Sequence, residues 1–102
     1  MKIVKVVYTV NADYAAKNMD NIKAVMNELR GLGGRGIFYH VCLGADGKTF
    51  IHTAFYRSEE EQGIVTGLTS FRYFQDQLKA SKPEATPRQE LLTFVGSSVD
   101  LF

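Results

Sequence analysis

Apolar residues follow two kinds of pattern along this chain. β-Branched and aromatic residues form short runs over 2–10, 36–56 and 90–99, which predicts β-strands. Between the first two runs, apolar residues recur every three or four positions, which predicts a helix that begins at Asn11 or Asp13 and ends at the following glycines. The predicted inner stripe of this helix consists of Ala15, Met19, Ile22, Met26 and Leu29.

A second helical region follows the middle run. Ser58 and Glu61 have the spacing of a capping box, and two glycines weaken the first turns. We therefore predict a short helix over 59–66 and a longer one over 70–81, then a proline-containing loop over 82–87. The predicted inner stripe consists of Ile64, Leu68, Phe71, Phe74 and Leu78.

This order of elements predicts an α+β fold. Right-handed crossovers place both helical regions on one face of a four-stranded antiparallel sheet, a ferredoxin-like βαββαβ arrangement in a single domain over 1–102. The other sheet face remains apolar, and no third helical region is available to cover it. We therefore expect a sheet-to-sheet homodimer. We expect the apolar tail, Leu101 and Phe102, to be held against the partner or the start of the second helical region.

Residues 36–56 form a predicted β-hairpin that carries the only two histidines. A two-residue turn at Asp46 and Gly47 would place His40 and His52 on opposite faces. A three-residue turn with Gly47 in a bulge would pair the two imidazoles on one face, where they would titrate as a coupled unit. We favour the bulged turn, because it needs glycine only once.

Composition and charge limit the classes of partner and site that the chain can have. The 102 residues are 45% hydrophobic and 23% charged, and the net charge of +1 comes from scattered basic residues, which argues against nucleic acid and membrane partners. A single cysteine excludes an internal disulfide and multi-cysteine zinc sites, and we expect Cys42 to be a buried apolar residue. The apolar run at the N-terminus is too short to span a bilayer, so we predict a cytoplasmic protein.

Three short motifs carry a resemblance to a known family: Tyr39-His40, the Asp46–His52 segment and the Ser70–Phe74 segment. With the order of elements, they resemble the dimeric α+β barrel superfamily, and within it the antibiotic-biosynthesis-monooxygenase-like and stress-responsive barrel proteins. The resemblance implies two sheets joined by dimerisation and a ligand cavity in some members. Haem-degrading and quinone-forming members use a tryptophan that this chain lacks, so no catalytic residue of the family transfers to a position here.

Two functions remain open from the residues. One is a cofactor-independent monooxygenase or isomerase acting on a small aromatic or polyketide-like molecule, with His40 or His52 as base. The other is a non-catalytic homodimer that binds a hydrophobic ligand or serves in regulation or assembly, with both histidines as packing residues. A metal held by the histidine pair is less favoured, because no third ligand is placed by the sequence. The candidate ligand-binding residues are Phe38, Phe50, Tyr56 and Phe74.

Overall fold

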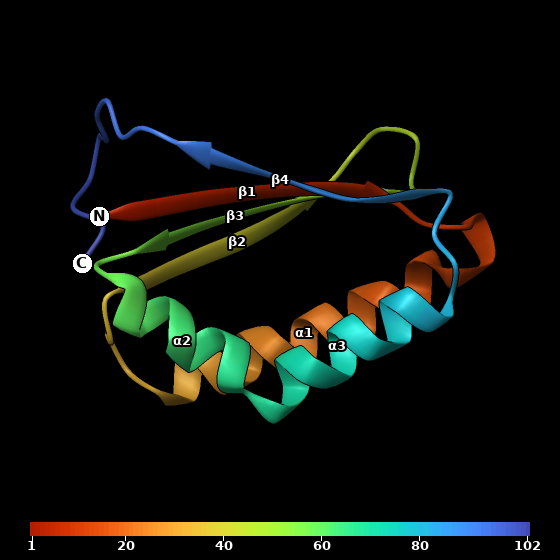
Figure 1. Ribbon diagram of the computed structural model, residues 1–102, viewed down its shortest axis with the longest axis horizontal. Coiled ribbons are helices and arrows are strands. Elements are labelled where there is room, and N and C mark those ends of the chain that lie inside the picture. The colour runs from red at the N-terminus through yellow and green to blue at the C-terminus, as the bar shows by residue number, and fades with distance from the viewer.

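The computed structural model describes all 102 residues, and it has a four-stranded antiparallel sheet with its helices on one face (Figure 1). The strands are β1 (Lys2–Thr9), β2 (Ile37–Leu43), β3 (Thr49–Tyr56) and β4 (Ala85–Leu92), in the order β2-β3-β1-β4. The helices are the short 3-10 helix η1 (Ala12–Tyr14), α1 (Ala15–Gly31), α2 (Glu59–Gly67) and α3 (Thr69–Ala80). The predicted α+β, ferredoxin-like fold is confirmed. None of the helices is both long and apolar enough to cross a bilayer.

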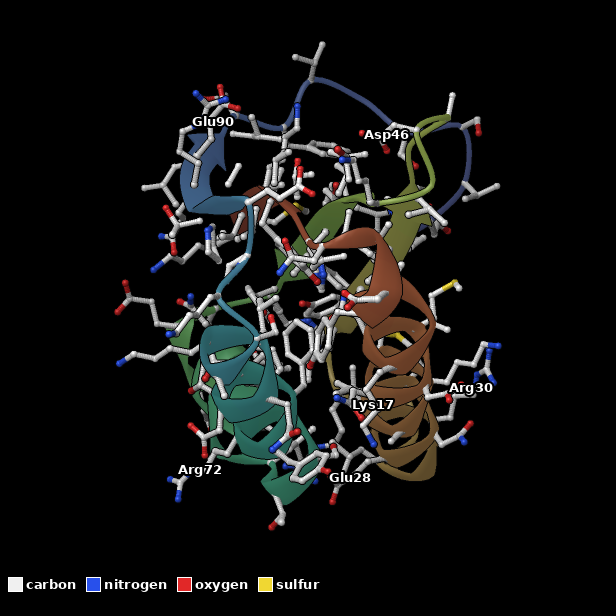
Figure 2. The ribbon with its side chains drawn as sticks, turned by 90° about the vertical axis from the view of Figure 1, so that its right-hand side faces the viewer. Lys17, Glu28, Arg30, Asp46, Arg72 and Glu90 are labelled. Atoms are coloured by element: carbon white, nitrogen blue, oxygen red, sulfur yellow. The ribbon has the colours of Figure 1, made fainter.

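The split of the second helical region is confirmed. The backbone of Leu68 is extended and separates α2 from α3. The N-terminus of α3 is capped from outside its own segment, because the Glu28 carboxylate of α1 accepts hydrogen bonds from the Ser70 hydroxyl at 2.5 Å and from its backbone N–H at 3.3 Å. Figure 2 shows α1 and α3 side by side with Glu28 at this end of the pair. The cap therefore joins the two main helices.

The first helix differs from its prediction in its start and in its buried face. Neither Asn11 nor Asp13 caps α1, because η1 intervenes and the Asn11 side chain turns toward the end of α3. The buried face of α1 is rotated from the predicted stripe, so that two asparagines are buried while its methionines and Leu29 are only partly buried. The buried residues are Ala15, Asn18, Asn21, Ile22 and Val25.

The prediction of a last strand over 90–99 is wrong, because β4 starts within the predicted loop and ends at Leu92. Pro87 is tolerated in this strand because β4 is a sheet edge and a bulge interrupts its pairing there. Val7 pairs with Arg88 and Thr9 with Ala85, so two residues of β4 lie opposite the single intervening residue of β1.

The segment after β4 loops out on the helix-free side of the sheet and then descends past the N-terminus, so that the C-terminus lies beside it (Figure 1). Residues of this segment border Ile3 and Phe55, and Ile3 is buried although no helix covers its face. At the end of the tail, the Arg57 guanidinium lies 5.4 Å from the centre of the Phe102 ring, directly before α2. The tail thus contacts the start of the second helical region.

The favoured hairpin register is wrong, and His40 and His52 do not face each other. His40 pairs with Thr53 and Val41 with His52, so the two histidines lie on opposite faces of the sheet. Gly47 does adopt a positive φ of 75°, but the Asp46 carboxylate accepts hydrogen bonds from two backbone N–H groups beyond it, those of residues 48 and 49, at 2.9 and 2.8 Å. These bonds draw one more residue into the loop, which reverses the face of every later side chain. The coupled titration predicted for the pair is therefore not expected.

Cys42 is a second correction on this hairpin. It is exposed on the helix-free face rather than buried, because it pairs with Ile51 on the side that no helix covers. The core instead lies between the helices and the sheet face that they cover. There Tyr8 and Phe50 stack with their ring centres 5.6 Å apart.

We predict that Phe50→Ala lowers the free energy of unfolding by about 3–5 kcal/mol, because it removes a ring that is 1% exposed at the centre of the core. The control is Asp76→Ala in α3, where the side chain is exposed and forms no ion pair, and we expect a change within about 0.5 kcal/mol. Urea unfolding followed by circular dichroism measures both. Equal losses for the two variants would contradict this description of the core.

Candidate functional site

A cavity of about 510 Å³ lies between the sheet and α3. Its walls come from both layers: β1, β2 and β3 supply one side, α3 the other, and the segment around β4 borders it. The lining residues are Val6, Tyr8, Tyr39, His52, Phe71, Phe74, Gln75, Leu78, Lys79, Lys82, Pro83, Thr86 and Pro87. Its size is within the range of small-molecule sites, about 300–1,000 Å³.

A hydrogen-bonded chain of four side chains borders this cavity. The Tyr8 hydroxyl lies 2.7 Å from His52 Nε2, and the Tyr39 hydroxyl lies 2.7 Å from His52 Nδ1. Asn18 of α1 donates from Nδ2 to the Tyr8 oxygen at 2.9 Å. Antiparallel pairing positions the three ring-bearing residues, because β3 lies between β1 and β2 and their side chains share the helix-facing side.

The three ring-bearing side chains carry one more hydrogen than their mutual hydrogen bonds use. A neutral imidazole has one N–H donor and one acceptor nitrogen, so the histidine and the two tyrosines carry three hydrogens for the two bonds that join them. A phenol oxygen can accept two hydrogen bonds, so Tyr8 can accept from Asn18 and either donate to Nε2 or accept from it; the imidazole correspondingly donates from Nδ1 to Tyr39 or accepts there from the Tyr39 hydroxyl. The first arrangement leaves the Tyr39 hydroxyl hydrogen for a molecule in the cavity, and the second directs it to Nδ1 and leaves the Tyr39 oxygen as an acceptor.

Asn18 is in the core for this bond rather than for packing. It is fully buried, and its Oδ1 atom has no hydrogen-bond partner. A buried acceptor without a donor costs about 1–3 kcal/mol, which an apolar residue at this position would avoid. We assign Asn18 the role of holding the Tyr8 hydroxyl toward His52.

Burial keeps the whole chain of groups uncharged at neutral pH. Desolvation lowers the pKa of His52 to about 4, because the charged imidazolium is disfavoured away from water. The same cause raises the pKa of Tyr8 and Tyr39 far above that of an exposed phenol and raises the pKa of Tyr56 to about 12. The site therefore donates and accepts hydrogen bonds from a neutral ground state.

The candidate residues named from the sequence do not all lie together. His52 and Phe74 line the cavity, with their ring centres 5.4 Å apart. His40 and Phe38 contact each other on the helix-free face, with ring centres 5.6 Å apart. Phe50 and Tyr56 share the helix-facing side with His52 but are buried in the core outside the cavity lining. A metal held between the two histidines is ruled out by their separation onto opposite faces.

Sequence reasoning missed Tyr8, Tyr39 and Asn18. The incorrect hairpin register assigned Tyr39 to the face opposite His52, which hid their contact. One signal was available: Asn18 lies three residues after Ala15 and four before Ile22, so a polar residue occupies a core-facing helical position. Buried polar groups need partners, and such a residue points to a buried polar site.

Comparisons with known proteins support the fold. No protein-family model and no curated protein matches the chain. Among solved structures, Rv0793 from Mycobacterium tuberculosis is 15% identical with a TM-score of 0.78, covering 96% of this chain and 98% of that one. An antibiotic biosynthesis monooxygenase is 10% identical with a TM-score of 0.79, covering 94% and 100%. PA3566 from Pseudomonas aeruginosa is 13% identical with a TM-score of 0.77, covering 93% and 94%. At these identities the similarity is one of fold alone, the α+β fold that the chain shares with these proteins.

We predict that His52 makes stability depend on pH above the range where carboxylates titrate. Its folded pKa is lowered to about 4 from 6.5, so below pH 6.5 the unfolded chain binds a proton that the folded chain excludes. The free energy of unfolding should therefore fall as the pH falls, by about 2 kcal/mol between pH 7 and 5 from this group. Urea unfolding at fixed chain concentration measures the slope. His52→Gln should lose this part of it, and an unchanged slope would contradict the assignment.

Proposed function

We propose that this chain is an enzyme that takes a proton from a flat, largely apolar substrate with an acidic O–H or C–H bond, a small aromatic or polyketide-like molecule. The observation that carries the proposal is the neutral Tyr8–His52–Tyr39 chain on the wall of an apolar cavity. Aromatic side chains of α3 offer faces to a flat ring system, and the hydroxyl and imidazole groups of Tyr8, His52 and Tyr39 offer a polar surface.

Both ring nitrogens of His52 are occupied by tyrosine hydroxyls, so the substrate would meet the base through Tyr39. The substrate proton passes to the Tyr39 oxygen while the Tyr39 hydroxyl proton passes to Nδ1, with His52 in the tautomer that donates from Nε2 to Tyr8. The products of this step are a substrate anion and an imidazolium. Each stabilises the other in the low-dielectric cavity, because opposite charges favour the ionised forms.

Proton removal is the step that an isomerase and a cofactor-independent monooxygenase share. In an isomerase the proton returns to another atom of the same molecule. In a monooxygenase the carbanion of a methylene gives electrons to O₂ and forms a hydroperoxide, which loses water to leave a carbonyl. The monooxygenase form is supported by the structural neighbour described as an antibiotic biosynthesis monooxygenase.

We predict that the chain accelerates solvent deuterium exchange at the methylene of anthrone, a flat ketone with an acidic C–H bond. Tyr39→Phe removes the hydroxyl that meets the substrate, and we expect exchange to slow by about 10²-fold or more. Proton NMR measures the exchange, and anthraquinone formation with oxygen uptake measures the oxidation.

The matched control is His40→Gln, because His40 is the other histidine and lies on the opposite sheet face. It should leave the exchange rate unchanged, whereas His52→Gln should reduce it as Tyr39→Phe does. If anthrone binds to the wild-type chain but exchanges at the buffer rate, the enzyme proposal fails, and a ligand-binding module without catalysis becomes the better interpretation.

We also propose that the chain forms a sheet-to-sheet homodimer through the helix-free face. Every residue of β4 is exposed, and large apolar side chains there and in the following segment remain in contact with solvent. The exposed large apolar residues of this region are Leu91, Leu92, Phe94, Val95 and Val99. Leu92 lies on the helix-free face, because it pairs with Ile3. Exposed apolar side chains of this size are typical of an interface, and a second copy of the same face is self-complementary.

For the dimer we predict a mass by light scattering of about twice the 11.4 kDa of one chain at micromolar concentration. Val7→Asp places a charge on the helix-free face, where Val7 pairs with Ile51, and should yield monomers of poor solubility. The control Ala24→Asp places the same charge on the exposed side of α1 and should leave the mass unchanged. A wild-type chain that remains monomeric would overturn the interface.

A further inference from the structure

The entrance of the cavity is positively charged. Lys79 in the last turn of α3 and Lys82 directly after it both border the cavity, and no carboxylate is among the lining residues. The ion pairs of the chain are Lys2–Glu59 and Lys48–Glu84, so neither of these two lysines has a partner. Two cations without an ion-pair partner thus lie at the edge of a cavity whose other lining residues are uncharged.

The backbone that carries Lys82 is held in an unusual conformation. Lys82 has a φ of 55°, the only positive value outside glycine in the chain. The Asn11 side chain fixes this turn by donating to the carbonyl oxygens of Ser81 and Lys82, each at 3.1 Å. A non-glycine residue in this region costs free energy and persists where surrounding contacts enforce it, often at ligand sites. The turn therefore presents Lys82 from a defined position.

The nearest acidic residue in sequence is directed elsewhere. Glu84 lies two residues after Lys82, but its carboxylate accepts from Lys48 Nζ at 2.9 and 3.1 Å, at the hairpin turn. The remaining polar lining near this end, Gln75 and Thr86, is uncharged and offers hydrogen-bond donors. An anionic group at the entrance would meet attraction from two lysines without an opposing carboxylate.

We infer that the substrate is an anion: an apolar, flat acid whose carboxylate or similar group lies at Lys79 and Lys82 while an oxygen at its other end meets Tyr39. The inference rests on the proposed function, since it names the substrate class of the same cavity. Its three parts match the three parts of the cavity: the Tyr39 hydroxyl at the inner wall, apolar side chains along the middle and cations at the entrance.

Two fluorescent probes that differ by one anionic group test this inference. They are 8-anilinonaphthalene-1-sulfonate and its neutral counterpart N-phenyl-1-naphthylamine. The ring-proton NMR signals of the two histidines report the place of binding, because His52 borders the cavity and His40 lies on the opposite sheet face. Fluorescence titration gives the affinity of each probe.

We expect both probes to shift the His52 signals and the sulfonate to bind several-fold more tightly. The double variant Lys79→Gln/Lys82→Gln should weaken the sulfonate by about five- to tenfold and leave the neutral probe within about twofold, since exposed ion pairs contribute little each. Salt at 0.5 M should reduce the same preference by screening. The control is Arg72→Gln, a cation on the same helix outside the cavity lining that points away from the helix pair in Figure 2; it should change neither affinity.

Two results would contradict the inference, and they differ in what else they overturn. If both probes shift His52 but bind equally, or the double variant weakens both alike, the anionic substrate is wrong and the cavity remains a ligand site. If neither probe shifts His52 in the wild-type chain, the cavity does not take flat apolar molecules, and the proposed function fails with the inference.

Discussion

The site depends on one constraint: an imidazole buried at 4% exposure must have both ring nitrogens hydrogen-bonded. His52 meets this condition through Tyr8 on one neighbouring strand and Tyr39 on the other, each at 2.7 Å. The order β2-β3-β1 is what allows it, because only a central strand has a partner hydroxyl on each side. Loss of either hydroxyl would leave a buried nitrogen unsatisfied, so the sheet order and the polar site support each other.

The hairpin loop decides whether this arrangement exists at all. With one residue more or fewer between β2 and β3, His52 and Tyr39 would lie on opposite faces of the sheet and could not contact each other. The Asp46 carboxylate sets the loop length through its bonds to the backbone N–H groups of Lys48 and Thr49, and a Lys48–Glu84 ion pair ties the loop to the start of β4. A short-range interaction in an exposed turn thus determines which side chains form the buried site between the sheet and the helices.

The fold was predictable from the sequence because hydrophobic periodicity and crossover handedness act on whole elements. The single helix-bearing face follows from such signals, and the break between α2 and α3 follows from the glycines that weaken α2. The site was not predictable in the same way, since it depends on the parity of one loop and on a tertiary bond from Asn18 to Tyr8. Residue propensity does not show whether the loop has an odd or an even number of residues. Glycine at position 47 can adopt its positive φ in either hairpin register, so this residue does not distinguish the two registers. The position of the last strand was predicted wrongly for a related reason: proline is excluded from central strands, but Pro87 is tolerated at an edge with a bulge.

The low pKa of His52 is compatible with its proposed role as a base. Desolvation lowers the pKa of His52 to about 4, because no negatively charged group of the chain lies beside the ring to oppose it. A substrate that loses its proton to Tyr39 supplies that charge, and a neighbouring anion raises the pKa of an imidazole, which opposes the effect of burial. Basicity would then arise only while the substrate anion forms, which directs stabilisation to the transition state rather than to the bound substrate. The lysines at the entrance are exposed and screened, so they attract an anionic substrate without strongly opposing an imidazolium at the inner wall.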